Sequence, residues 1–162
     1  MKPTVYIETT IPSFLTARKT NDPLAAGEQE ATRRWWNDRR QQFDLFVSLL
    51  VLEEAAMGDT EAAQKRLEAL SGLPLLDSDE VVDELTDIIM ASGAIPARAK
   101  ADAVHVSLAS RHNMDFLLTL NCKHIANAQL NRRLNEVISS AGYRMPVICT
   151  PLELMGDNND DA

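Results

Sequence analysis

Short apolar, β-prone runs alternate along this chain with longer segments whose apolar residues recur at helical spacing, and this alternation limits the possible folds more than any other feature. The predicted strands are residues 4–7, 43–48, 73–76, 115–119 and 146–149. The predicted helices are residues 24–42, residues 49–71 with a break near Gly58, a segment capped by Asp77 or Ser78 and ended by Gly93, residues 98–112, and a segment from Leu130 to Gly142. Strands that alternate with helices need crossover connections, so the sequence predicts an α/β fold with a mainly parallel sheet covered on both faces.

Length and composition agree with a single domain. The 162 residues are 45% hydrophobic, which is too high a fraction for a disordered chain. We expect one domain over residues 1–152, followed by an acidic, disordered tail over residues 153–162. No apolar run is long enough to span a bilayer, and Glu8 interrupts the first apolar segment too early for a signal peptide. We therefore expect a cytoplasmic protein that does not bind membranes.

Charge and cysteine content exclude two classes of protein. The formal net charge is −8, which argues against a module held to nucleic acid by its overall field. Cys122 and Cys149 are too few for a disulfide scaffold, and Cys122-Lys123-His124 supplies at most two zinc ligands. We expect both cysteines to be small, buried thiols.

Four polar residues from distant parts of the chain are predicted to meet at one edge of the sheet. Helices run antiparallel to the strands they connect, so each helix begins at the edge where the strands end. Glu8 and Asn121 follow predicted strands, while Glu54 and Asp102 lie in the first turns of predicted helices. Three carboxylates at one edge repel each other unless a cation lies between them, and oxygen ligands suit Mg²⁺ or Mn²⁺. The hydroxyl of Thr10 is an auxiliary ligand candidate for the metal, a water or a phosphate.

Segments of this chain resemble, in order and spacing, the successive motifs of PIN domains, including the VapC-type toxins of bacterial toxin–antitoxin systems. The segments are Tyr6-Ile7-Glu8-Thr9-Thr10, Ser48 to Glu54 with Gly58, Ala101-Asp102-Ala103 followed by Leu108-Ala109, and Leu117 to Asn121. The resemblance covers roughly residues 4–150. It implies a three-layer α/β/α domain with a central, mainly parallel sheet of about five strands, and a divalent-metal-dependent ribonuclease site for single-stranded RNA.

The resemblance also implies the roles of individual residues. By position in the motifs, Glu8 matches the first acid, Glu54 the second, Asp102 the third and Asn121 the fourth. All four are thereby implied as catalytic residues and as ligands of Mg²⁺ or Mn²⁺. A homodimer is expected from the family, and an antitoxin protein is the partner that the toxin resemblance implies.

Two other functions stay open. The family's first acid is usually aspartate and its fourth is often aspartate, whereas this chain has Glu8 and Asn121. These departures motivate a catalytically degenerate PIN-like module that binds RNA or a protein partner. A phosphate-accepting receiver domain with a flavodoxin-like sheet is the other alternative. It expects paired acids after the first strand and a lysine after the fifth, where this chain has Glu8-Thr9-Thr10 and Thr150-Pro151.

Several of the polar residues also have a simpler structural interpretation. Glu8 and Asn121 are suited to capping helices. Glu53 competes with Glu54 for the second acidic position, but neighbouring helix residues point about 100° apart, and the spacing favours Glu54. We assign no histidine to catalysis, and expect structural, capping or solvent-facing positions for His105, His112 and His124.

A basic run surrounds two tryptophans in the first long helical segment. The arginines are Arg33, Arg34, Arg39 and Arg40, and the tryptophans between them are Trp35 and Trp36. We expect a solvated helix with both tryptophans packed inward. Contact with an RNA backbone or with a partner protein is the second interpretation.

Overall fold

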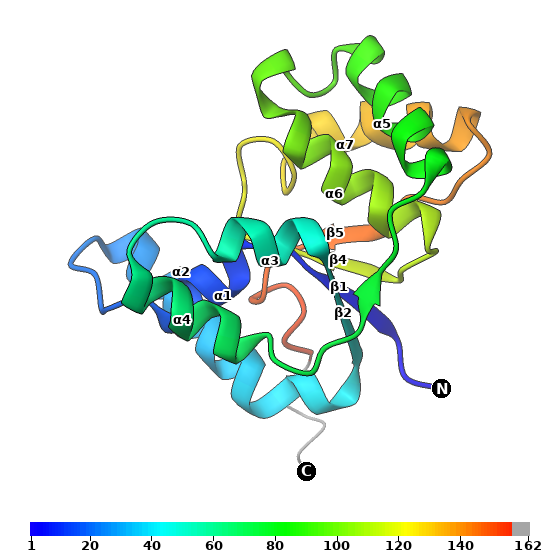
Figure 1. Cartoon of the computed structure of the whole chain (residues 1–162). Coiled ribbons are helices and arrows are strands. Elements are labelled where there is room, and N and C mark those ends of the chain that lie inside the picture. Colours follow the sequence, from blue (N-terminus) through cyan, green and yellow to red (C-terminus); the bar gives the residue numbers. More distant parts are fainter. Residues whose placement is uncertain (157–162) are drawn as a thin grey trace.

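A five-stranded, entirely parallel sheet forms the centre of the molecule (Figure 1). The computed structural model describes residues 1–156, so the last residues of the expected acidic tail, 157–162, lie outside the described part of the chain. The strands are β1 (Thr4–Ile7), β2 (Asp44–Ser48), β3 (Leu75–Leu76), β4 (Phe116–Leu118) and β5 (Val147–Cys149), and their order across the sheet is β3-β2-β1-β4-β5. All five predicted strands are confirmed, with β3 and β5 at the edges.

Helices cover both faces of this sheet. They are α1 (Thr10–Thr16), α2 (Pro23–Arg34), α3 (Leu49–Ala55), α4 (Thr60–Ala69), α5 (Glu80–Ser92), α6 (Lys100–Arg111) and α7 (Ala128–Ser140). Figure 1 shows α5, α6 and α7 on one side of the sheet and α1, α2 and α4 on the other, in agreement with the contacts that α5 makes with α6 and α7, and α1 with α2 and α4. The predicted three-layer α/β/α fold is therefore confirmed.

The helix boundaries differ from the prediction where capping residues decide them. The sequence pattern did not indicate α1, which contains Pro12 in its first turn. Helix α5 is capped by Asp79, whose side chain accepts a hydrogen bond from the Val82 amide, so the prediction of Asp77 or Ser78 was wrong. Gly58 separates α3 from α4 with a φ of +84°, a left-handed conformation that glycine tolerates best.

The tryptophan segment is helical but not a continuous α-helix. After α2 the chain forms a π-helical turn over Trp35–Arg39 (η1) and a 3₁₀ turn over Arg40–Gln42 (η2). Trp35 is 0% exposed and Trp36 is 9% exposed, which confirms that both pack inward. The Arg40 guanidinium lies 4.3 Å from the centroid of the Trp36 ring, so part of the basic run is engaged with the protein itself. A short 3₁₀ turn over Ala97–Ala99 (η3) leads into α6.

The core lies where the central strands meet the helices. Val5, Tyr6 and Ile7 of the middle strand β1 are all fully buried. Cys149 is buried as expected, but Cys122 is exposed, so the prediction of two buried thiols was wrong for Cys122. Within the described residues, every helix is too short or too polar to cross a membrane.

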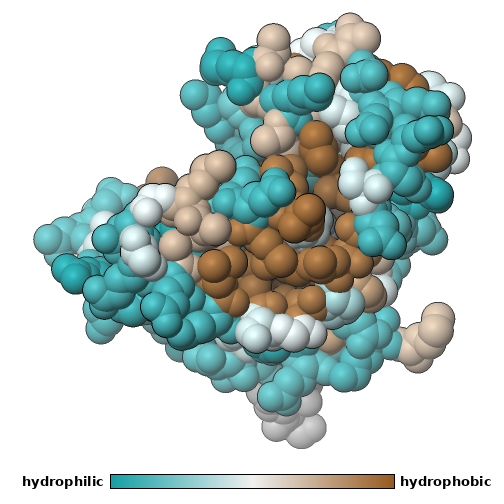
Figure 2. Space-filling view, viewed as in Figure 1, coloured by the Kyte–Doolittle hydropathy of each residue, from teal (hydrophilic) through white to brown (hydrophobic). Residues whose placement is uncertain are grey.

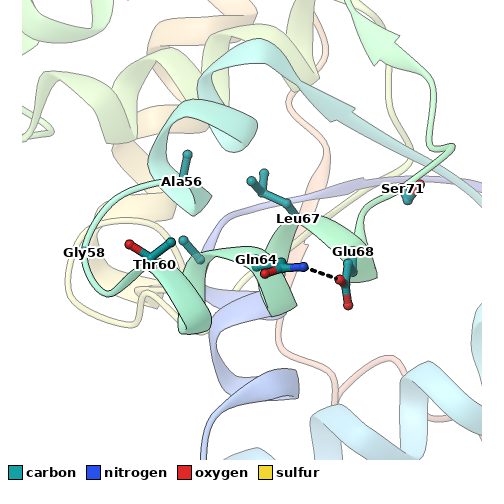
Figure 3. A pocket seen from close by; sticks show the side chains of 8 residues that line it. Ala56, Gly58, Thr60, Gln64, Leu67, Glu68 and Ser71 are labelled. Carbon is teal, nitrogen blue, oxygen red and sulfur yellow. Dashed lines mark hydrogen bonds between the residues drawn. The ribbon is translucent and has the colours of Figure 1, made fainter.

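Some apolar surface is left uncovered beside the edge strand β3. Leu49 at the start of α3 and Leu75 on β3 are 61% and 47% exposed, and Figure 2 shows hydrophobic residues gathered in a hollow where α3 and β3 lie in Figure 1. A groove of about 710 Å³ runs along α4. Its lining residues, shown in Figure 3, are Ala56, Gly58, Thr60, Ala63, Gln64, Leu67, Glu68 and Ser71. None of the predicted site residues lines this groove, so the groove is separate from the predicted acidic site.

Candidate functional site

The direction of chain winding changes at β1. Strands β2 and β3 lie on one side of β1, and the chain then crosses over to place β4 and β5 on the other side. In open parallel sheets, ligands bind in the crevice outside the carboxyl ends of the strands at such a reversal. Glu8 directly follows β1, and Thr119 directly follows β4, so both residues lie at this point of the molecule.

Glu8 is a buried carboxylate that is anchored through one oxygen. It is only 4% exposed, and Oε2 accepts hydrogen bonds from the Thr10 amide (2.9 Å), the Thr10 hydroxyl (2.5 Å) and the Thr119 hydroxyl (2.9 Å). No described residue donates a hydrogen bond to the other oxygen, Oε1. Burial raises the pKa of the Glu8 carboxyl, because desolvation outweighs the electrostatic effect of His105 and the three hydrogen bonds that favour the ionised form. Glu8 therefore accepts a hydrogen bond from the first amide of α1, and its other oxygen is bonded by no described residue.

Glu54 projects from α3 and is anchored in the same way. Its side chain is 28% exposed, and Oε1 accepts hydrogen bonds from the Thr9 hydroxyl (2.7 Å) and from Nε2 of His105 (2.6 Å). No described residue donates a hydrogen bond to its other oxygen, Oε2. Burial would raise the pKa of Glu54, but the hydrogen bonds from His105 and Thr9 outweigh that effect and lower the pKa. The neighbouring Glu53 is exposed, as predicted.

Asp102 lies in the first turn of α6 and contacts a histidine. Its side chain is 19% exposed, and Oδ2 lies 2.9 Å from Nδ1 of His124, whose side chain is 14% exposed. A carboxylate can only accept hydrogen bonds, so Nδ1 of His124 is the donor in this pair. His124 is therefore a neighbour of the predicted site, although no pattern in the sequence indicates this position.

Asn121 organises the turn that carries His124. Its side-chain oxygen accepts a hydrogen bond from the backbone amide of His124 (3.1 Å). The backbone amide of Asn121 donates to the Thr119 hydroxyl (3.0 Å). Asn121 therefore stabilises a turn and does not cap a helix, and the residue that caps α7 is Asn127. The hydrogen bond from the His124 amide brings the imidazole of His124 to Asp102, so Asn121 is linked to the acidic residues through a neighbour.

Neighbouring residues link the four predicted site residues to one another. The Thr119 hydroxyl donates to Glu8 and accepts from the backbone amide of Asn121, which is linked through His124 to Asp102. On the other side, Thr9 and Thr10 follow Glu8 directly along the chain. Thr10 donates to Glu8, whereas the Thr9 hydroxyl donates to Glu54. Glu8 is therefore linked to Asn121 and Asp102 by hydrogen bonds, and to Glu54 through the backbone at Thr9.

The oxygens of this network suit a hard cation, although they do not form a ready-made cage. In the described part of the chain, no group of three or more His, Cys, Asp or Glu side chains is placed to hold a metal ion. Mg²⁺ commonly binds proteins through one or two carboxylates and keeps several waters. Oε1 of Glu8 and Oε2 of Glu54 are carboxylate oxygens of this kind, since neither has a protein hydrogen-bond partner. The donor set therefore fits Mg²⁺ or Mn²⁺ with water completing the coordination.

Two histidines that we had not assigned to the site contact its carboxylates. The expectation of a structural position for His105 is confirmed, since it is 0% exposed, but its ring also donates to Glu54. His112 is half-buried, and its Nε2 lies 2.7 Å from the Asp77 carbonyl oxygen. The position of His105 near the site has one signal in the sequence. His105 follows Asp102 by three residues, and this spacing places both side chains on one face of the helix.

Comparison with known proteins identifies one matching family. A family model described as "PIN domain" matches residues 24–129, which is more than half of the chain. The matched segment includes Glu54, Asp102 and Asn121, but it begins after Glu8 and Thr10. Among curated proteins, none matches this sequence.

Proposed function

Because the chain belongs to the PIN-domain family, whose members are in general nucleases, we propose that it is an endoribonuclease that cleaves single-stranded RNA with the help of Mg²⁺ or Mn²⁺. One observation carries the proposal. Glu8 is a buried carboxylate with a raised pKa and one oxygen that no described residue bonds, and it is linked through Thr9 to Glu54 and through Thr119, Asn121 and His124 to Asp102. A divalent cation would offset the desolvation of such a group.

Each residue has a separate part in this mechanism. Glu8, Glu54 and Asp102 would hold the cation, with Asn121 and the Thr10 hydroxyl beside it. When bound, the cation would lower the pKa of a water molecule and offset the charge of the scissile phosphate. Thr10 and Thr119 keep Glu8 in a fixed orientation through Oε2, so that Oε1 remains available. The nucleophile would be water, so no side chain has to attack the phosphate.

The proposal predicts that single acidic residues are essential for cleavage. Asp102→Asn and Glu54→Gln remove one negative charge each at nearly constant volume. We expect each to lower the rate of single-stranded RNA cleavage in Mn²⁺ by at least about a hundredfold, the scale for losing one electrostatic group in an active site. Glu53→Gln is the matched control, because Glu53 is the exposed neighbour of Glu54 on α3 and should retain wild-type activity. Equal activity of Asp102→Asn and wild type, or cleavage that survives chelation, would contradict the proposal.

A non-catalytic module is the second candidate function. It is favoured by the observation that the described residues contain no ready-made group of three metal-binding side chains, and by the presence of Glu8 and Asn121 where the family often has aspartate. Calorimetry with Mn²⁺ separates the two functions. Stoichiometric binding that Glu8→Gln abolishes favours the nuclease, whereas no measurable binding favours the inert module.

The VapC-type resemblance extends the proposal to partners. The protein would be the cytoplasmic toxin of a toxin–antitoxin pair, with residues 1–152 as the nuclease domain and a homodimer as its assembly. An antitoxin would inhibit it by covering the acidic site. Adding the product of the neighbouring gene to the cleavage assay tests this pairing, and undiminished cleavage would argue against it.

A further inference from the structure

A row of buried polar side chains leads from the interior of the sheet to Glu54. The hydroxyl of Tyr6, on the middle strand, lies 2.8 Å from the Ser48 hydroxyl and 2.7 Å from Nδ1 of His105. The other ring nitrogen of His105, Nε2, lies 2.6 Å from Oε1 of Glu54. Tyr6 and His105 are 0% exposed and Ser48 is 2% exposed, so water does not compete for these hydrogen bonds.

The chemistry of the two ends gives the row one direction. The ionised carboxylate of Glu54 accepts hydrogen bonds only, so Nε2 of His105 is the donor. In the tautomer that carries its proton on Nε2 alone, Nδ1 accepts a hydrogen bond from the Tyr6 hydroxyl, whose oxygen accepts the proton of Ser48. Ser48 accepts in turn from the Val51 amide (3.2 Å), as the cap of α3. In this arrangement each hydroxyl donates once and accepts once.

Such a row is an unusual component of a sheet interior. A buried polar group is costly unless it is hydrogen-bonded, and apolar residues would fill the same space without that requirement. Each polar side chain of the row has the next one as a hydrogen-bond partner, and the row ends at Glu54 of the candidate site.

We propose that Tyr6 and His105 are positioning residues that fix Oε1 of Glu54 and thereby direct Oε2 toward the cation, an inference that rests on the proposed function. A glutamate side chain has several rotatable bonds and loses conformational freedom when it binds a metal. A hydrogen bond from a buried imidazole removes that freedom in advance, and Thr9 restrains the same oxygen from the other side (2.7 Å). Partners that orient metal-binding carboxylates typically contribute about ten- to a hundredfold to metal affinity or activity.

Tyr6→Phe tests the row at its centre, because it removes one hydroxyl and keeps the buried ring. We expect the Mn²⁺ concentration that gives half-maximal cleavage to rise, or kcat to fall, by about ten- to a hundredfold in total. The chain offers a matched control in Tyr143→Phe, since Tyr143 is half-buried and its hydroxyl bonds no described residue. That control should leave both quantities unchanged.

Variants of His105 separate positioning from a purely structural role. His105→Gln keeps a donor for Glu54, whereas His105→Leu keeps none, so we expect the glutamine variant to retain more activity at low Mn²⁺ than the leucine variant. Ser107→Ala is the control for buried polarity in the same helix, because Ser107 is 0% exposed and bonds Thr86 (3.0 Å) away from the site. It should lower the melting temperature without changing the Mn²⁺ dependence. An unchanged Mn²⁺ dependence in both Tyr6→Phe and His105→Leu would overturn the proposal.

A second measurement does not depend on catalysis. In ¹⁵N NMR spectra of the metal-free protein, His105 should carry its proton on Nε2, and Tyr6→Phe should shift the Nδ1 resonance toward that of an acceptor without a partner. A crystal structure of Tyr6→Phe should show Glu54 in altered or multiple orientations. If both the Nδ1 resonance and Glu54 are unchanged, the positioning role is overturned, whether or not the wild-type protein cleaves RNA. If the wild type neither binds Mn²⁺ nor cleaves RNA, the proposed function fails, and these two spectroscopic and structural results still decide the role of Tyr6 and His105.

Discussion

The two glutamates of the site are held by the same arrangement of hydrogen bonds. Each has one oxygen bound by hydroxyl, amide or imidazole donors, and each has a second oxygen with no described partner. Their surroundings nevertheless have opposite effects, since burial raises the pKa of Glu8 while donors lower the pKa of Glu54. Residues with the same functional group are thus made chemically different by their neighbours.

The two cysteines differ for a related reason, and their reactivity is a test at the same scale. Burial raises the pKa of the Cys149 thiol to about 12, whereas Cys122 is exposed. The thiolate is the reactive form, so we expect a thiol reagent at pH 8 to modify one cysteine in the folded protein and two after unfolding. Cys122→Ser should abolish the modification of the folded protein. Two equally fast thiols in native buffer would contradict the burial of Cys149.

Among the elements, α5 shows how a capping residue links a helix to its neighbour. Asp79 accepts a hydrogen bond from the Val82 amide (3.0 Å) and from Nε of Arg111 on α6 (3.1 Å). These two helices pack directly against each other on one face of the sheet. Because α6 also carries Asp102 and His105, the contact between α5 and α6 helps to set the position of the site.

The Asp79 interactions should make the stability of the protein depend on pH. The hydrogen bond from Val82, together with Arg111, lowers the pKa of Asp79 in the folded state. The stabilisation that ionised Asp79 gives the folded state is therefore fully present above its unfolded pKa of about 3.9. It is lost as the pH falls through the lower pKa of the folded state. We expect the difference in urea midpoint between wild type and Asp79→Asn to disappear across that range. Asp59→Asn is the control, because Asp59 caps α4 and forms no ion pair with a described residue. Its urea midpoint should stay close to that of wild type. A difference that persists to the lowest pH would contradict the assignment.

At the scale of the whole molecule, the desolvated carboxylate of Glu8 lowers the stability of the fold. Glu8 lies at the centre of the sheet edge, where its ionised form is desolvated. Its folded pKa is raised, so stability is unaffected well below the unfolded value of about 4.3 and decreases as the pH rises from there to the folded value. The desolvation of Glu8 therefore makes the protein less stable at neutral pH than at acid pH.

This opposition predicts that Glu8→Gln stabilises the metal-free protein. With EDTA at pH 7, the urea midpoint of Glu8→Gln should exceed that of wild type, and the difference should shrink toward pH 4. Mn²⁺ should then raise the unfolding free energy of wild type by about 2.7 kcal/mol at a hundred times the dissociation constant, and should leave that of Glu8→Gln unchanged. Glu53→Gln, on the exposed side of α3, should behave like wild type in both conditions. A midpoint for Glu8→Gln below wild type at every pH would show that its hydrogen bonds outweigh its desolvation.

The sequence by itself determined the strands and most of the helices. Apolar runs such as residues 4–7 and 115–119 report burial directly, and helical spacing reports which face is covered, so neither depends on distant partners. The rule that parallel strands end at one edge predicts a common site for Glu8, Glu54, Asp102 and Asn121, and this stays a prediction. Short-range cap choices such as Asp79 over Asp77 were missed, because both residues have the same capping chemistry.

Only the tertiary structure decided the strand order and the partners of the site carboxylates. The reversal at β1 follows from how helices pack on the two faces, which no local pattern records. Tyr6 and His105 are 99 positions apart, and His124 is 22 positions from Asp102, so their hydrogen bonds exist only after the sheet and α6 have packed together. A buried tyrosine or histidine has no sequence signature that distinguishes a structural residue from one that orients a carboxylate, because the difference lies in which atom the fold brings within hydrogen-bonding distance.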